Sequence, residues 1–207
     1  MSTTATAKLE CCPLPPDDLL FQHYHDHEWG VPTACDQAIY EKVCLEGFQS
    51  GLSWRTILHR RDGFRRAFAE FDPQRVAAFD AFYIEELMQD EGIIRNRRKI
   101  ASAINNAKRA IALKAEFGSI AAFFWQFEPA ASDRPSSVTR QWLSENTRTT
   151  ESTNLAKALK QRGWTFVGPV NMYALMQALG LVNDHVVGCG QRKRIDGLRK
   201  RFVRPVL

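Results

Sequence analysis

The stretch LEGFQSGLSW, residues 45–54, joins two predicted helices and decides how they meet. Ile39, Val43 and Glu46 recur at helical spacing, so the Glu46 carboxylate is expected on the same face as two aliphatic core residues. Two glycines then interrupt the helix, and Ser53 is the expected N-cap of a second helix that begins with Trp54. The sequence therefore predicts a kinked pair of helices with a glutamate and a tryptophan beside one concavity.

An inward carboxylate needs a partner, because burying an unpaired charge costs several kcal/mol. In one interpretation, Glu46 caps a neighbouring helix or pairs with an arginine. In the other, Glu46 is the counter-charge of a small pocket for a flat cationic ligand, and Trp54 is the wall on which the ligand stacks. Spacing alone leaves both interpretations open.

Length and composition predict one globular domain. The chain has 207 residues, of which 44% are hydrophobic and 25% charged, values that are ordinary for a protein with its own core. We expect a flexible leader at 1–11, a single domain at 12–190 and a basic tail at 191–207. Neither a signal peptide nor a membrane-spanning apolar run is present in the sequence, so a cytoplasmic protein is expected.

The positive charge is concentrated at the end of the chain. Residues 191–207 hold seven basic residues against Asp196, whereas the rest of the chain carries a formal charge of −1 within a total of +5. A solvated terminus of this kind would add only non-specific, salt-sensitive affinity for nucleic acid.

Apolar residues at helical spacing dominate, so the predicted fold class is all-α. Asp17 and Asp18 can cap a short first helix, and residues 23–32 are interpreted as a turn because Gly30 and Pro32 follow closely. Residues 128–152 are predicted to be a long connection with one turn near Trp142. The other predicted helices are 36–50, 53–61, 63–71, 73–79, 83–90, 96–117, 119–127, 152–162, with Ser152 as cap and Gly163 at the end, and 169–179.

Residues 83–100 combine a short helix, a tight turn at 91–94 and a long helix that opens with Arg95, Arg97 and Lys99. This pattern is typical of a helix-hairpin-helix element, in which hairpin amides and a helix N-terminus face a phosphate. An ordinary helical corner would have the same spacing.

Two cysteines and two histidines could form a complete tetrahedral zinc set, namely Cys12, His25, His185 and Cys189. The spacing of the first pair differs from that of zinc fingers, and buried thiols with satisfied histidines are the alternative. An odd total of five cysteines and no export signal argue against disulfides. A second metal site on His23, His25 and His27 would need a strand, which the neighbouring turn residues disfavour.

Five blocks of sequence resemble one known family, in that family's order. They are YHDHEWGVP at 24–32, LEGFQSGLSW at 45–54, GIIRNRRKI at 92–100, FVG at 166–168 and GLVNDHVVGC at 180–189. Over residues 12–189 the chain is similar to the bacterial DNA-3-methyladenine glycosylase I family.

The resemblance implies an all-α helix-hairpin-helix DNA glycosylase fold with one structural zinc that ties the N-terminal segment to the C-terminal one. It implies hydrolysis of the N-glycosidic bond of 3-methyladenine in alkylated double-stranded DNA, which releases the base and leaves an abasic site. No catalytic metal, organic cofactor or protein partner is implied, and we expect a monomer. The residues that it implies are Cys12, His25, His185 and Cys189 for zinc, Glu46 for catalysis, Tyr24, Trp54, Phe21 and Glu46 for the base, and Gly92, Ile94, Arg95, Arg97 and Lys99 for DNA.

Physical chemistry agrees with this pocket and limits its mechanism. Methylation makes the purine cationic, so aromatic rings and a buried carboxylate select it over neutral adenine. The charge moves from base to sugar in the transition state, so Glu46 should contribute more to selectivity than to rate. The sequence identifies no general base and no Schiff-base lysine.

Two departures from the family pattern are Leu14 and Phe21, each where an aromatic or a tyrosine is usual. They motivate a second hypothesis, a DNA-binding module without base release. A third hypothesis is a metal-dependent hydrolase using His23, His25 and His27.

Overall fold

The computed structural model describes residues 11–206, and these residues form helices and turns without a strand. The expected all-α class is therefore confirmed, while residues 1–10 of the expected leader lie outside the described residues. None of the described helices is long and apolar enough to cross a membrane. The elements are α1 Leu19–His27, α2 Asp36–Gln49, α3 Trp54–Leu58, α4 Arg61–Ala67, η1 Ala69–Phe71, α5 Pro73–Ala77, α6 Ala81–Leu87, α7 Arg97–Phe117, α8 Ile120–Trp125, η2 Ala131–Asp133, α9 Arg140–Glu145, α10 Thr150–Gln161, α11 Pro169–Ala178 and α12 Gln191–Arg201.

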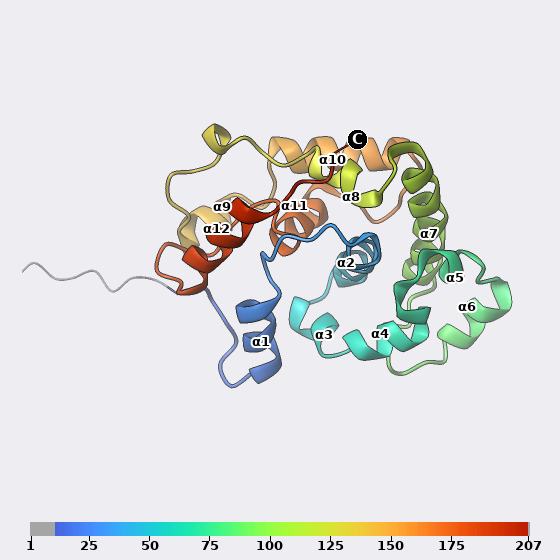
Figure 1. Cartoon of the computed structure of the whole chain (residues 1–207). Coiled ribbons are helices and arrows are strands. Elements are labelled where there is room, and N and C mark those ends of the chain that lie inside the picture. Colours follow the sequence, from blue (N-terminus) through green and yellow to red (C-terminus); the bar gives the residue numbers. More distant parts are fainter. Residues whose placement is uncertain (1–10, 207) are drawn as a thin grey trace, which may run out of the picture.

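Helix α2 lies in the middle of the molecule and packs against α3, α7, α8 and α11 (Figure 1). Ile39, Val43, Leu45 and Phe48 are all buried, and they face more than one side of the helix. A helix surrounded in this way needs apolar residues around most of its circumference. The placement of α2 explains why Glu46 is held inside the protein.

Capping residues fix most of the helix starts at the predicted positions. The side chains of Asp18, Ser53 and Asp72 accept hydrogen bonds from the first turns of α1, α3 and α5. One cap differs: Thr149 starts α10, and Ser152, the predicted cap, is the third helical residue, whose hydroxyl accepts from the Thr149 amide. The predicted start was therefore three residues late.

The predicted helix at 63–71 is broken in the structure. Helix α4 ends at Ala67, and Ala69, Glu70 and Phe71 have positive φ angles of 50°, 56° and 56°. This left-handed turn reverses the chain into α5 while Phe68 and Phe71 stay buried and stacked at 5.6 Å between ring centroids. No glycine or proline lies at residues 69–71, so residue types do not indicate the turn.

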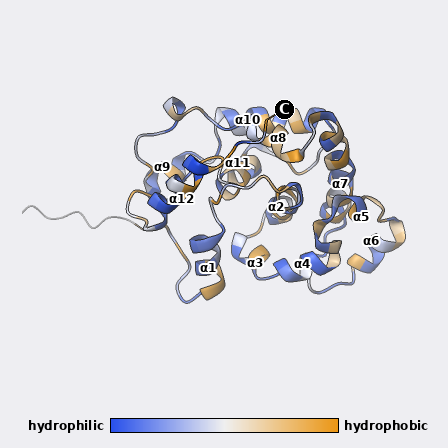
Figure 2. Ribbon diagram, in the orientation of Figure 1, coloured by the Kyte–Doolittle hydropathy of each residue, from blue (hydrophilic) through white to orange (hydrophobic). Residues whose placement is uncertain are grey.

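The chain differs from expectation at both ends of the domain. Residues 23–27, interpreted as a turn, belong to helix α1. Residues 191–201, expected in a solvated tail, form helix α12, which is strongly hydrophilic in Figure 2 but buries Ile195. Arg199 donates to the Gly180 and Leu181 carbonyls, so the helix is bound to the body by charge-assisted hydrogen bonds.

The short helix, turn and long helix predicted at 83–100 are present as α6, residues 88–96 and α7. The turn is fixed to α4 by a contact between two glycines: a Cβ atom added at Gly63 would lie 2.3 Å from the Gly92 carbonyl oxygen. The two backbones therefore touch without intervening side chains. Asn96 caps α7 by accepting from the Lys99 amide at 3.2 Å.

Candidate functional site

A cavity of about 400 Å³ lies between α1, α2, α3, α9 and α11. The predicted residues Phe21, Tyr24, Glu46 and Trp54 all line it, although they come from three different helices. The structure thus brings Glu46 and Trp54, which were expected beside one concavity, together with Tyr24 and Phe21, which the family resemblance implied. The other lining residues are Cys12, Pro13, Leu14, His25, Trp29, Gln49, Leu143, Asn146, Thr147, Val170, Tyr173, Ala174 and Gln177.

Glu46 is the charged group of the cavity. Its side chain is 4% exposed, and its Oε2 atom has no hydrogen-bond partner among residues 11–206. Burial raises the pKa of Glu46 to about 7, and the nearby Lys42 opposes that rise. One interpretation of the sequence is that Glu46 caps a helix or pairs with an arginine. Neither partner is found at this oxygen among the described residues, so it is free to accept a hydrogen bond from a ligand.

The aromatic wall is formed by Tyr24 and Trp54, whose ring centroids lie 5.3 Å apart with a 44° angle between planes. Phe21 meets Tyr24 edge to face at 6.4 Å. The Trp54 Nε1 donor is buried without a partner, like the Glu46 oxygen. An unused donor and an unused acceptor in one cavity suit a flat ligand that carries both kinds of group.

Asp18 holds the wall together from outside the cavity. Its Oδ1 atom caps α1, while Oδ2 accepts hydrogen bonds from Arg55 at 2.6 Å and His59 at 2.9 Å, beside α3. These bonds, with that from His59 the strongest influence, hold the pKa of Asp18 at about 2. Because α1 carries Tyr24 and α3 carries Trp54, this contact fixes one ring against the other.

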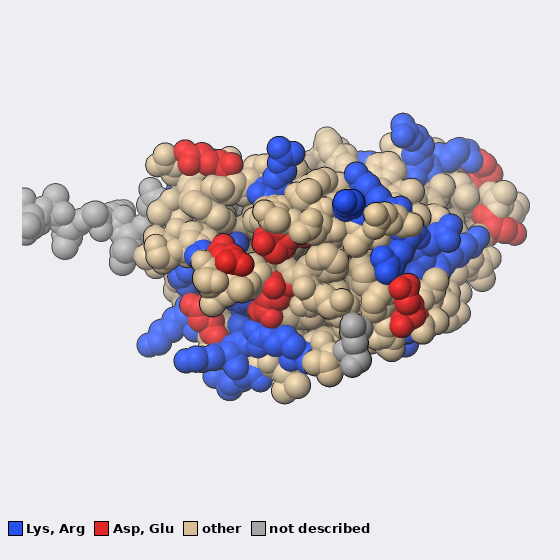
Figure 3. Space-filling model, turned by 90° about the horizontal axis from the view of Figure 1, so that it is seen from above, with Lys and Arg blue, Asp and Glu red and all other residues tan. Residues whose placement is uncertain are grey.

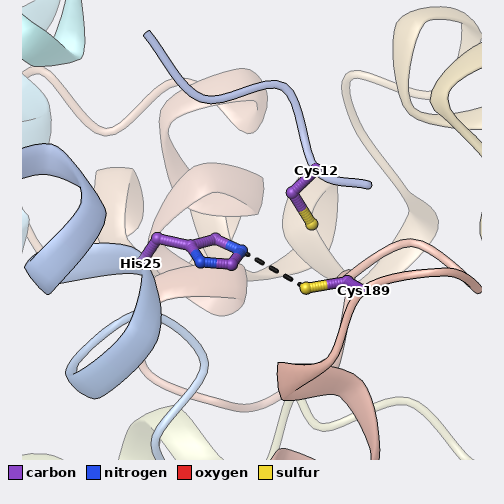
Figure 4. Close-up of side chains that lie close together, drawn as sticks. All are labelled: Cys12, His25 and Cys189. Atoms are coloured by element: carbon purple, nitrogen blue, oxygen red, sulfur yellow. Dashed lines mark hydrogen bonds between the residues drawn. The ribbon is translucent and has the colours of Figure 1, made fainter. Parts of the chain in front are cut away.

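Three of the four predicted metal ligands form a cluster beside the cavity. The donor atoms of Cys12, His25 and Cys189 all lie within 4.8 Å of one another, and His25 Nε2 is 3.5 Å from Cys189 Sγ (Figure 4). Asp26 accepts from His25 Nδ1 at 2.7 Å, which leaves the Nε2 lone pair facing the sulfur atoms. Burial raises the pKa of the Cys12 thiol to about 12, so a thiolate there needs a cation beside it.

His185 adjoins this cluster, with its ring centroid 4.9 Å from that of His25. Asn183 donates through Nδ2 to Arg192 and Asp196, so its Oδ1 faces His185 and accepts from Nδ1 at 2.9 Å. The buried Nε2 atom then carries a lone pair and has no partner among the described residues. Burial, followed by the neighbouring His25, lowers the pKa of His185 to about 4, so the ring is neutral. These features fit the donor set of a tetrahedral metal site.

The histidines next to this cluster do not join it. His23 and His27 are exposed one helical turn apart, with ring centroids at 4.6 Å, whereas His25 is buried on the opposite side of α1. A helix cannot place three alternate residues on one face. The arrangement that a His23, His25 and His27 metal site would require is therefore absent.

The residues predicted to bind DNA lie on the turn before α7 and in the first turn of α7, and none of them lines the cavity. Arg97 pairs with Glu85, and Lys99 Nζ donates to the Phe48 and Ser50 carbonyls at 2.8 and 2.6 Å. Arg95 is exposed, and its nearest carboxylate is that of Glu91 at 3.7 Å. Basic side chains gather toward both ends of the face seen in Figure 3, with acidic side chains among them. The charge of Arg95 is thus the one most available to a phosphate among these three.

The methyladenine glycosylase family model matches residues 15–193 of this chain. The chain belongs to that family. It is 44% identical to DNA-3-methyladenine glycosylase 1 of Escherichia coli K12 over 182 residues, which are 87% of this chain and 96% of the relative.

Solved structures of 3-methyladenine DNA glycosylase I have the same fold. One crystal structure has a TM-score of 0.80 and 42% sequence identity, covering 87% of this chain and 97% of its own. The Staphylococcus aureus enzyme, whose structure describes recognition of 3-methyladenine, has a TM-score of 0.78 and 32% identity, covering 85% and 93%. The expected family resemblance is therefore confirmed.

Several residues at the cavity of this methyladenine glycosylase family member were not predicted from the sequence. Gln49, one turn after Glu46 on α2, lines it, as do Tyr173 and Gln177 on α11. Lys42, one turn before Glu46, contacts the aromatic wall from outside. Helical spacing from Glu46 could have identified Lys42 and Gln49, whereas nothing in the sequence places α11 beside α2.

Proposed function

We propose that this protein is a monofunctional DNA glycosylase that releases 3-methyladenine from alkylated DNA and thereby begins base excision repair. The observation that carries the proposal is the buried, unpartnered Glu46 oxygen beside the Tyr24 and Trp54 rings. A positively charged flat base supplies the partner that this carboxylate lacks, while neutral adenine does not. Membership of the methyladenine glycosylase family supports the same conclusion.

The reaction breaks the bond between the sugar carbon and the purine nitrogen. The bonding electrons leave with the base and neutralise its positive charge, and a water molecule adds to the sugar and loses a proton. To reach the cavity, the nucleotide must first be flipped out of the duplex, which costs less for a base that pairs badly. Tyr24 and Trp54 hold the flipped base by stacking, and Glu46 orients it by its charge.

The test is a single-turnover assay on DNA treated with a methylating agent, with the released bases identified by chromatography. We expect release of 3-methyladenine by the wild type. A folded protein that binds duplex DNA in a salt-dependent way but releases no base would instead support the binding-module hypothesis. Leu14→Phe and Phe21→Tyr would then test whether the departures from the family pattern cause the loss.

We propose that the turn at 88–96 and the start of α7 form the helix-hairpin-helix that contacts the DNA backbone. Exposed Arg95 supplies the charge, and the Ile94 amide is the candidate backbone donor to a phosphate, because the Gly92 amide already donates to Asp90 Oδ1 at 2.7 Å. Arg97 acts through its pair with Glu85, which keeps α6 against α7. Lys99 has a structural role, because its ammonium caps the carbonyls at the end of α2.

Arg95→Gln is expected to weaken duplex binding and to reduce the slope of log affinity against log salt concentration by about 1. Lys99→Gln should leave that slope unchanged and lower the free energy of unfolding by about 1 kcal/mol, because it removes charge-assisted bonds to two carbonyls. Fluorescence anisotropy at several salt concentrations and urea unfolding measure the two effects. A reduced slope for Lys99→Gln would show that its ammonium leaves the carbonyls and contacts DNA.

We also propose that Cys12, His25, His185 and Cys189 hold one structural zinc ion. The unpartnered His185 nitrogen and the clustered Cys12, His25 and Cys189 donors support it. Four protein ligands leave no open position, so the ion would stabilise the fold and take no part in the reaction. It would join the segment before α1, whose Cys12 lines the cavity, to the segment before α12.

A further inference from the structure

Lys42 is a second charged side chain of the pocket region that the proposed function does not use. It lies on α2 one turn before Glu46, and its Nζ atom donates to the Tyr24 hydroxyl at 3.1 Å. The same ammonium lies 4.6 Å from the ring centroids of both Tyr24 and Trp54. Lys42 does not line the cavity itself. A fixed cation therefore lies in the fork between the two rings, behind the wall on which a base would stack.

The charges around Lys42 come from several elements. Glu46 and Glu41 are on α2, Glu28 follows α1, and Arg61 begins α4. Glu28 is already paired with Arg61, and Glu41 with Arg65. Glu46 is the carboxylate near Lys42 that is not paired with an arginine. The Lys42 ammonium lowers the pKa of Glu46, against the larger rise that burial causes.

This arrangement sets the charge that an incoming base meets. With both groups ionised, Lys42 and Glu46 together are neutral, so a cationic purine adds a net positive charge to a buried region. Glu46 attracts the cation, whereas Lys42 repels it across the rings. When the glycosidic bond breaks, the purine becomes neutral and the repulsion disappears, while the attraction by Glu46 disappears as well.

We propose that Lys42 opposes Glu46 during the reaction: it weakens ground-state binding of the cationic purine and favours departure of the purine as a neutral molecule. Lys42 is thus a positioning and specificity-determining residue, which acts through the field behind Tyr24 and Trp54 without touching the base. The inference rests on the proposed glycosylase function. Destabilising the charged ground state relative to the transition state raises the rate of the chemical step and lowers affinity for the free cation.

The test compares the wild type with Lys42→Met, which keeps the length and removes the charge, and Lys42→Arg, which keeps the charge. At pH 7, Lys42→Met should bind 3,9-dimethyladeninium, which keeps the positive charge of the purine in DNA, about tenfold more tightly. It should release 3-methyladenine from DNA about tenfold more slowly, with binding of neutral adenine unchanged. Lys42→Arg should resemble the wild type. Lys108→Met, on an exposed position of α7, is the control for loss of a lysine.

The opposite results identify what has failed. Weaker binding and slower release together in Lys42→Met would mean that Lys42 only holds Tyr24 in place, and unchanged constants would mean that its charge is not felt; either overturns the inference. Absence of base release by the wild type overturns the proposed function, and the relative affinities for 3,9-dimethyladeninium and adenine then still decide the role of Lys42. Base release by the wild type with equal affinity of wild type and Lys42→Met for the cation would overturn the inference alone.

Discussion

Glu46→Gln is expected to reduce affinity for 3,9-dimethyladeninium, a purine that keeps the positive charge of the methylated base in DNA, by about 10- to 100-fold while leaving affinity for adenine nearly unchanged. The substitution keeps the size of the side chain and removes the charge that pairs with the cationic base. Because Glu46 has a pKa of about 7, the difference between wild type and variant should grow as pH rises through 7, where the carboxylate becomes ionised. Calorimetric titration of this cation and of adenine at pH 6 and pH 8 measures both effects.

Glu41→Gln provides the matched control, since Glu41 lies on the same helix but pairs with Arg65 and does not line the cavity. Its affinity for both bases should equal that of the wild type. Equal affinity of Glu46→Gln and wild type for 3,9-dimethyladeninium at pH 8 would remove Glu46 from the pocket mechanism.

Glu46→Gln should also change the free energy of unfolding, with a sign that follows from the raised pKa of Glu46. A buried carboxyl whose pKa rises from 4.5 to about 7 on folding favours the folded state most when it is protonated, below pH 4.5. That contribution is lost as pH increases through 7, and the shift corresponds to about 3 kcal/mol. Urea unfolding should therefore show Glu46→Gln gaining stability over the wild type between pH 5 and pH 8.

Removal of zinc is expected to have the largest effect on the fold. Ion binding at a thousandfold excess over its dissociation constant stabilises a protein by about 4 kcal/mol, which corresponds to roughly 8–16 °C in melting temperature for a chain of this size. We expect chelated protein and Cys189→Ser to melt lower than zinc-loaded wild type by at least this amount. Differential scanning calorimetry with zinc analysis of each sample makes the measurement.

Cobalt substitution tests the ligand set separately from stability. A tetrahedral site with two thiolates gives characteristic visible absorption bands, which should disappear in Cys12→Ser and change in His185→Ala. Cys35→Ser, at an exposed cysteine before α2, should leave the bands and the melting temperature unchanged. A His185→Ala spectrum identical to that of the wild type would restrict the site to the three clustered residues.

The local parts of the fold could be predicted because their signals are local. Caps at Asp18, Ser53 and Asp72 fix helix starts through hydrogen bonds within one turn. The left-handed turn at 69–71 could not be predicted, since the burial of Phe68 and Phe71 stabilises a backbone that its residue types disfavour. Helix α12 was missed for a related reason: Ile195 and the bonds of Arg199 matter only once the rest of the body is folded.

The candidate site shows the same division. Helical spacing placed Glu46 inside the protein, and the structure confirms that it is buried. The positions of Tyr24 and of the α11 residues depend on how separate helices pack, which periodicity does not specify. At Lys99 the sequence shows an ammonium group but cannot show the two carbonyls that accept hydrogen bonds from it, because these belong to a helix distant in sequence.

The direct backbone contact between Gly63 and Gly92 has a consequence for how lesions are found. No side chain separates the two backbones there, so direct backbone contact sets the distance between α4 and the turn at 88–96, the proposed DNA contact. In the proposed complex, the DNA must deform to contact this turn while one nucleotide enters the cavity, so the deformation energy is stored in the DNA. Duplex sites that deform easily would bind with the lowest deformation energy. The protein would therefore favour flexible base-pair steps before any base enters the cavity.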